Sequence, residues 1–183
     1  MIDAYRLREK EELKKIPNDK PGYYKWWATR EDFEHILRVL NINFADIENA
    51  LEVKDTYYCI YIGIAAKESV RQRLDWHIND KHTVSKVCNG TLSTLRQSLS
   101  SVYAHNQYDK ATTNACIDRF KVEYFCIDTA IKSSETVVAL HETERALLCD
   151  HLYVLNIMDN HHPLATDIKK TLKRLRKESK VQH

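Results

Sequence analysis

Residues 57–64 read Tyr57-Tyr58-Cys59-Ile60-Tyr61-Ile62-Gly63-Ile64, an almost uninterrupted run of apolar and aromatic side chains. A run of this length and composition is typical of a strand that is buried near the centre of a sheet. Two other short stretches that are rich in aromatic residues predict strands, namely 22–28 (GYYKWWA) and 120–127 (FKVEYFCI). These three strands are the predicted centre of the fold.

Helical patterns occupy the segments between and around these strands. Thr29 and Asp32 have the spacing of a helix cap, and apolar residues follow them at helical intervals. The same periodicity predicts helices over about 4–16, 29–40, 41–52, 70–77, 92–102, 137–155 and 167–180. The sequence therefore predicts an α/β fold, with a small three-stranded sheet flanked by helices. Its expected parts are an N-terminal helical extension (1–20), a domain over 21–160 with a helical insertion at about 29–54, and a basic C-terminal helix (161–183).

Composition indicates a globular protein. The 183 residues are 43% hydrophobic and 30% charged, and no apolar stretch approaches the ~20 residues of a membrane span. Charged residues 8–12 (REKEE) occupy the place where a secretory signal would be apolar. The five cysteines form no C-x-x-C pair, and the isolated glycines at 22, 63 and 90 exclude a glycine-rich phosphate loop. We therefore expect a soluble, cytoplasmic protein with reduced cysteines and no membrane partner.

The last predicted helix concentrates positive charge. Segment 167–180 has seven basic and two acidic residues, in a chain whose net charge is only +2. Such a segment suggests a polyanionic partner, although a solvated helix face gives the same pattern. The side chains that we expect to contact a nucleic-acid backbone are Lys169, Lys170, Lys173, Arg174, Arg176 and Lys177.

Two tripeptides and the polar residues after them occur in a recognisable order. The tripeptides are Gly22-Tyr23-Tyr24 and Tyr61-Ile62-Gly63, and the next predicted helix carries Arg73 and His77 four residues apart. Further along, Glu144 begins the segment Glu-Arg-Ala-Leu-Leu, and Asn156 follows that helix. Over residues 21–156 this order resembles the GIY-YIG nuclease superfamily, in particular its restriction-type and homing-type endonucleases.

Two features depart from the family pattern. The helical insertion at 29–54 stands where minimal members have a short turn. The first tripeptide has Tyr23 in place of the motif's Ile, so that Tyr24 takes the position of the motif's tyrosine. Because neighbouring side chains of a strand point to opposite faces, only one of Tyr23 and Tyr24 can belong to a functional site.

The resemblance implies an endonuclease that hydrolyses DNA phosphodiester bonds with the help of Mg²⁺, for which Mn²⁺ is a substitute. Glu144 would hold the single metal ion, which would take its other ligands from water and phosphate. The guanidinium of Arg73 would bind phosphate oxygens. A tyrosine would remove the proton from the attacking water, and both Tyr24 and Tyr61 fit this role.

The resemblance also assigns roles to two further residues. His77 would accept a proton from the tyrosine or donate one to the phosphate, and Asn156 would orient the tyrosine or hold the final loop. A free tyrosine has a pKa near ~10, so its use as a base demands a strongly cationic setting. Besides the metal and Arg73, Lys25 and Lys67 are candidates for that positive charge.

Each of these residues also has a purely structural interpretation. Tyr24 and Tyr61 could be core tyrosines, Arg73 could form a surface ion pair, and Glu144 could be a solvated helix residue with Glu142 as its rival. The alternative functions are a catalytically inactive nucleic-acid-binding module of the same fold and an RNA-directed nuclease. No second DNA-binding unit is recognisable, so specificity would come from this domain, from a homodimer or from a partner protein.

Overall fold

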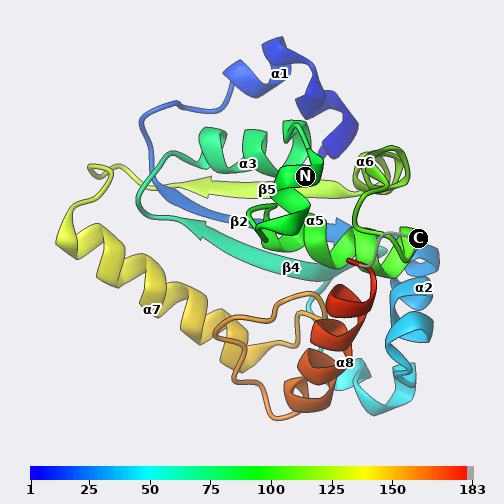
Figure 1. Cartoon of the computed structure of the whole chain (residues 1–183). Helices are drawn as coiled ribbons and strands as arrows, with labels where there is room; N and C mark the ends of the chain where they lie inside the picture. The colour runs from blue at the N-terminus through cyan, green and yellow to red at the C-terminus, as the bar shows by residue number, and fades with distance from the viewer. Residues whose placement is uncertain (181–183) are drawn as a thin grey trace.

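Five antiparallel strands form one sheet in the order β1-β5-β2-β4-β3 (Figure 1). The computed structural model describes residues 1–180. Its long strands are β2 (Gly22–Ala28), β4 (Tyr57–Ala65) and β5 (Lys121–Cys126), in the three predicted stretches. The predicted three-stranded sheet is wrong at its edges, where β1 (Ile2–Asp3) and β3 (Val53–Lys54) add short strands. Two residues are too few to show an alternating pattern, so periodicity cannot detect such strands.

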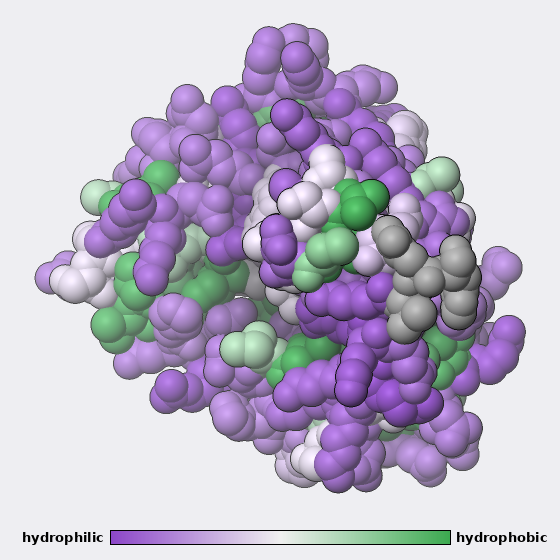
Figure 2. Space-filling view, viewed as in Figure 1, coloured by the Kyte–Doolittle hydropathy of each residue, from purple (hydrophilic) through white to green (hydrophobic). Residues whose placement is uncertain are grey.

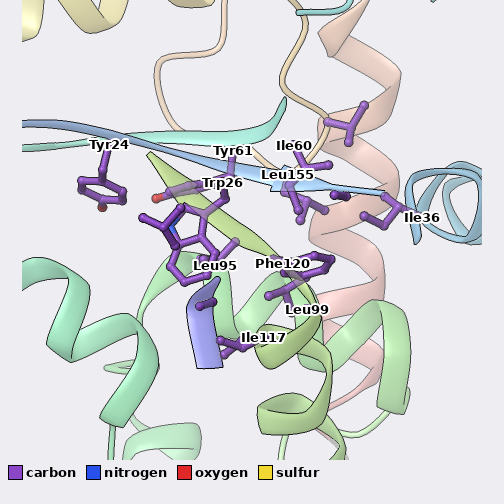
Figure 3. Close-up of a cluster of buried hydrophobic side chains, with 14 of the residues drawn as sticks. Tyr24, Trp26, Ile36, Ile60, Tyr61, Leu95, Leu99, Ile117, Phe120 and Leu155 are labelled. Atoms are coloured by element: carbon purple, nitrogen blue, oxygen red, sulfur yellow. The ribbon is translucent and has the colours of Figure 1, made fainter. Parts of the chain in front are cut away.

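The helices lie on both faces of the sheet. Figure 1 shows α3 (Val70–Asn79), α5 (Thr94–Leu99) and α6 (Lys110–Arg119) over one face, and α7 (Ser134–Asp150) across the other. The larger hydrophobic core lies on the α3 side and includes Tyr24, Trp26 and Tyr61, whose side chains share one face of the sheet (Figure 3). A smaller cluster on the α7 side contains Trp27, Cys59, Ile62, Leu148 and Tyr153.

The insertion between the first two long strands is helical only in its first part. Helix α2 (Arg30–Leu40) begins as predicted at Thr29, whose hydroxyl oxygen accepts a hydrogen bond from the Asp32 amide at 3.2 Å. It ends at Asn41, whose φ of 56° lies in the left-handed region that terminates helices. The predicted second helix over 41–52 is instead two short 3₁₀ turns, Phe44–Asp46 and Glu48–Ala50.

The first and the last described segments of the chain pack on the same core as the sheet. The predicted helix over 4–16 is a 3₁₀ turn (Ala4–Arg8) followed by the short α1 (Lys10–Lys14), and Leu7 and Ile16 are fully buried. Helix α8 (Ala165–Glu178) contributes Ala165, Ile168 and Leu172 to the larger core. The terminal segments are therefore structural parts of the folded domain.

The remaining elements complete the layer around α3. Helix α4 (Val84–Cys88) and helix α6 were not predicted, and α5 continues into a π-helical turn at Ser100–Ala104. The five cysteines are free thiols. Most of the surface in Figure 2 is hydrophilic. Within residues 1–180, none of the helices combines the length and the apolar character needed to traverse a bilayer.

Candidate active site

Strand pairing brings the two site tyrosines to one face of the sheet. Tyr24 on β2 lies opposite Gly63 on β4, and Trp26 lies opposite Tyr61. The ring of Tyr24 extends over Gly63, where a Cβ atom would stand 2.3 Å from the Tyr24 hydroxyl oxygen. A glycine is therefore required at position 63, because only a residue without a side chain lets the Tyr24 ring lie across the neighbouring strand.

Helix α3 supplies a histidine to the same face. The helix starts at Ser69 with a reciprocal cap, in which Ser69 and Gln72 exchange side-chain to backbone hydrogen bonds of 3.0 and 3.1 Å. Two turns on, the buried His77 ring lies 2.7 Å from the Tyr24 hydroxyl, measured to Nε2. Its other ring nitrogen, Nδ1, has no hydrogen-bond partner within residues 1–180. The Tyr24–His77 pair thus lies almost completely buried, with 2% of the Tyr24 surface exposed, near the end of a fixed helix.

Burial keeps this pair uncharged. Burial lowers the pKa of His77 well below its ordinary value, and the positive charges of Arg73 and Arg96 lower it further. Burial likewise raises the pKa of Tyr24 well above 10, while the charge of Arg73 opposes the rise. At neutral pH the imidazole is therefore neutral and can accept a hydrogen bond from the phenol at Nε2.

Tyr61 is nearly as buried as Tyr24, with 8% of its surface exposed. Burial, with the nearby Glu144 as a second cause, raises the pKa of Tyr61 to about 12, and the charge of Arg73 acts in the opposite direction. The Tyr61 ring lies 6.0 Å from the His77 ring, edge to face. Both predicted tyrosines therefore lie beside His77, and the charge of Arg73 lowers the pKa of each.

Arg73 is one turn before His77 on α3. Its guanidinium forms an ion pair with Glu68 at 2.9 Å and lies 5.0 Å from the centre of the Trp76 ring. Its Nε is buried without a partner in the described part of the chain. The neighbouring Asp75 instead accepts a hydrogen bond from Asn79. Arg73 thus retains a buried donor without a partner among the described residues, and its side chain remains 28% exposed.

Glu144 reaches this site from α7. Burial, together with the charge of Asp159, raises the pKa of the Glu144 carboxyl to about 7, although Arg73 opposes the rise. The side chain is 15% exposed, and Nδ1 of His141 lies 3.8 Å from its carboxylate. Glu142 is exposed to solvent, so it does not compete for this position.

The surroundings of Glu144 suit a divalent cation. The carboxyl lines a hollow of about 260 Å³ with His141, Arg145, Asp159 and His161. Two carboxylates at the edge of a partly buried hollow repel each other unless a cation neutralises them. Within residues 1–180 there is no group of three or more His, Cys, Asp and Glu side chains that could hold a metal. A cation at Glu144 would therefore take most of its ligands from water and phosphate.

Asn156 is fixed to the backbone of β4. Its side-chain amide donates to the Ile62 carbonyl at 2.8 Å and accepts from the Ile62 amide at 2.9 Å. Of its two expected roles, these contacts match the one in which it holds the final loop. Through Asn156 the chain after α7 is attached to the strand that carries Tyr61.

The neighbours of Tyr24 on β2 face the other side of the sheet. Tyr23 stacks on Phe125 with ring centres 4.6 Å apart. Lys25 pairs with Glu52 at 2.5 Å, and the Tyr153 hydroxyl also donates to Glu52. The expectation that Lys25 supplies positive charge to the tyrosines is therefore wrong, because strand alternation directs it away from them. Lys67 is exposed.

The basic residues of α8 differ in their surroundings. Lys169 donates to the Asn160 carbonyl at 2.5 Å, and Arg176 reaches the Gln97 side chain. The four others lie on the outer side. Lys170 and Arg174 form ion pairs within the helix, to Asp167 and Glu178, whereas Lys173 and Lys177 are exposed. Only part of the predicted basic surface is therefore directed to solvent.

Three residues of this region were not predicted as site residues: Glu68, Trp76 and Asp159. Glu68 and Asp159 lie in loops with no local pattern that marks them; Glu68 is a near neighbour of Arg73 in the sequence, whereas only the fold brings Asp159 to Glu144. Trp76 does carry a signal, because a large aromatic residue lies within the helix segment that holds Arg73 and His77.

A family model described as the GIY-YIG catalytic domain matches residues 22–178. The match runs from the first residue of β2 to the last residue of α8. Neither the curated proteins nor the solved structures yield a significant match to this chain.

Proposed function

The chain belongs to the GIY-YIG catalytic-domain family, and from that premise we propose that it is a metal-dependent endonuclease that cuts DNA. Domains of this family are nucleases, so the chain is an enzyme that acts on nucleic acid. The choice of DNA, the metal and the roles of individual residues belong to the proposal.

The observation that carries the proposal is the convergence of four kinds of group on one site. The Tyr24–His77 hydrogen bond, the partly exposed Arg73 and the carboxyl of Glu144 come from one strand, β2, and two helices, α3 and α7. Phosphodiester hydrolysis needs a base for water and positive charge at the phosphate. A structural tyrosine–histidine pair would not need a partly buried carboxylate and an arginine beside it.

Arg73 would bind the scissile phosphate. Its guanidinium offers several donors in a plane that matches phosphate oxygens, and it is already held by Glu68 and Trp76. Such a fixed donor favours the additional negative charge that develops on the phosphate oxygens in the transition state.

Tyr24 would take the proton from the attacking water, after its own proton has moved to Nε2 of His77 at 2.7 Å. The negative phosphate beside Arg73 would offset the positive charges that lower the pKa of His77, so the imidazole would become a better acceptor. Tyr61 would support this pair from β4, where Glu144 and Arg73 act on its hydroxyl.

Glu144, next to Asp159, would hold the Mg²⁺ or Mn²⁺ ion, which would supply positive charge for the phosphate and for the departing oxygen. Sequence specificity would come from this domain, from a second copy of the chain or from a partner protein.

The direct test is to incubate the protein with supercoiled plasmid in Mg²⁺, in Mn²⁺ and in EDTA, and with an RNA of matched sequence. We expect nicked or linear plasmid with either metal and intact plasmid in EDTA. Cleavage of the RNA alone would assign the chain to RNA. Binding of DNA without any cleavage under these conditions would instead support the inactive binding module.

A further inference from the structure

Trp76 is the tryptophan that reaches the surface. Of the three tryptophans, Trp26 and Trp27 are at most 1% exposed, whereas Trp76 is half-buried on α3. It belongs to neither hydrophobic cluster of the described residues. A large aromatic ring at the surface, in the helix that carries the site, therefore needs a reason other than core packing.

The ring of Trp76 stands between the site and a separate hollow. Its centre lies 5.0 Å from the Arg73 guanidinium and 5.7 Å from the His77 ring, at an angle of 28° to that ring. Because a helix turns about 100° per residue, Arg73 and His77 lie on one flank of Trp76. Residues 72, 75 and 79 lie on its other flank.

On that other flank is an open hollow of about 470 Å³. It is lined by Gln72, Asp75, Trp76, Asn79, Asp80, Lys81 and Lys86. The two acids already have partners, because Asp80 pairs with Lys86 at 2.9 Å and Asp75 accepts from Asn79 at 2.8 Å. What the hollow offers a ligand is therefore an aromatic wall, side-chain amides and the exposed Lys81.

We propose that this hollow binds a nucleobase, stacked on Trp76, of the strand whose phosphate Arg73 holds; the proposal rests on the proposed nuclease function. In a nucleotide a single sugar joins the base to its phosphate. Arg73 and Trp76 are close enough together to bind the phosphate and the base of one nucleotide. Stacking on an aromatic side chain is a general means of holding bases of any sequence. The cap at Ser69 uses Oε1 of Gln72 and the bond to Asp75 uses Nδ2 of Asn79, so what remains to contact a base edge is the Gln72 Nε2 donor and the Asn79 Oδ1 acceptor.

The proposal has a consequence for the substrate. A base cannot stack on Trp76 while it remains stacked inside a duplex, so the nucleotide next to the cut must be displaced from its neighbours. The enzyme would therefore bind a short single strand by its bases as well as by its phosphates.

Fluorescence provides the test, because Trp76 is the exposed emitter. A short single-stranded oligodeoxynucleotide is titrated into the protein in EDTA, which prevents cleavage, in parallel with an abasic strand that has the same number of phosphates. We expect the base-containing strand to quench the emission and the abasic strand to quench it far less. Trp76→Phe should lose the quenching and bind within a few-fold of the parent, since phenylalanine still stacks. Trp76→Ala should bind about tenfold more weakly, as measured by anisotropy of a labelled strand.

Equal quenching by the abasic strand, or unchanged affinity of a folded Trp76→Ala, would overturn the base subsite. Plasmid cleavage by the same preparations separates this inference from the nuclease function. A parent that cuts DNA without base-dependent quenching refutes the subsite and retains the nuclease. Base-dependent quenching in a parent that never cuts DNA retains the subsite and counts against the nuclease.

Discussion

The Tyr24–His77 hydrogen bond is the most constrained contact of the site, because both partners are almost completely buried. Tyr24→Phe removes only the hydroxyl. We expect cleavage to fall by about 10²-fold or more, as is typical when a proton-transfer group is lost. Loss of a buried hydrogen bond should also cost about 1–3 kcal/mol of stability, measurable by urea denaturation.

Tyr23→Phe is the matched control for that substitution, because Tyr23 faces Phe125 on the other side of the sheet. It should cleave plasmid at the parental rate. If Tyr61→Phe abolished cleavage while Tyr24→Phe retained it, Tyr61 would be the base and Tyr24 its support.

The carboxyl of Glu144 should control the pH dependence of the protein. Its pKa is about 7 in the folded state against an ordinary value of 4.5, so between these values the folded protein retains a proton that the unfolded chain has released. Without metal, Glu144 should therefore lower the stability as pH rises through this window, opposite in sign to the contribution of the buried His77, and Glu144→Gln should remove the Glu144 part of the slope. Denaturant unfolding in EDTA from pH 4.5 to 8 measures this slope of stability against pH. An unchanged slope in Glu144→Gln would contradict this assignment.

The affinity for Mn²⁺ should rise over the same pH range, because the ion binds the deprotonated carboxyl of Glu144.

At the scale of elements, the register of β2 on β4 creates the site. Gly63→Ala would place a methyl group 2.3 Å from the Tyr24 hydroxyl oxygen and displace the ring from His77. We expect loss of cleavage of about 10²-fold or more and a stability cost of roughly 1–3 kcal/mol from overpacking. Thr29→Ser keeps the cap of α2 and serves as a control that should retain full activity. A fully active Gly63→Ala would mean that the position of the Tyr24 ring is unimportant for catalysis.

The elements also show what the sequence could predict. The three long strands are predictable because each is a short run rich in apolar and aromatic residues, α3 because of its helical periodicity, and α2 because Thr29 marks its start. The edge strands were missed because two residues form no pattern, and residues 41–52 were misread because an apolar residue every three or four positions fits 3₁₀ turns as well as a helix.

The same limit applies to the candidate site. Tyr24, Arg73, His77 and Glu144 are recognisable from motifs, and His77 has a helical spacing from Arg73. No motif marks Glu68 or Asp159, which contact or influence Arg73 and Glu144 in the folded chain. The misassigned Lys25 could have been corrected from the sequence alone, since the alternation that separates Tyr23 from Tyr24 also separates Lys25 from Tyr24.

At the scale of the whole molecule, α8 combines a core face with a charged outer face. Deleting it would expose Ile168 and Leu172 and unfold the domain, so its charges are better tested singly. Lys173→Gln and Lys177→Gln alter exposed residues. If both contact phosphates, each should reduce the slope of log affinity for duplex DNA against log salt by about 0.9. Lys10→Gln, an exposed lysine on α1, is the control and should not change the slope. If the salt dependence of DNA affinity were unchanged in both α8 variants, this surface would be a solvated helix face that contacts no phosphate.

In the proposed nuclease, Glu144 holds the metal ion and is not merely a helix residue. The most direct measurement compares plasmid cleavage and DNA binding by the parent, Glu144→Gln and Glu142→Gln in the same Mg²⁺ buffer. Glu→Gln preserves size, and Glu142 is exposed on the same helix, so both variants should remain folded. Glu144→Gln should lose at least 10²–10³ in cleavage rate, about 3–4 kcal/mol or more, and bind DNA as tightly as the parent or more tightly. Glu142→Gln should match the parent. Cleavage by Glu144→Gln at the parental rate would show that the Glu144 carboxyl has no part in the reaction.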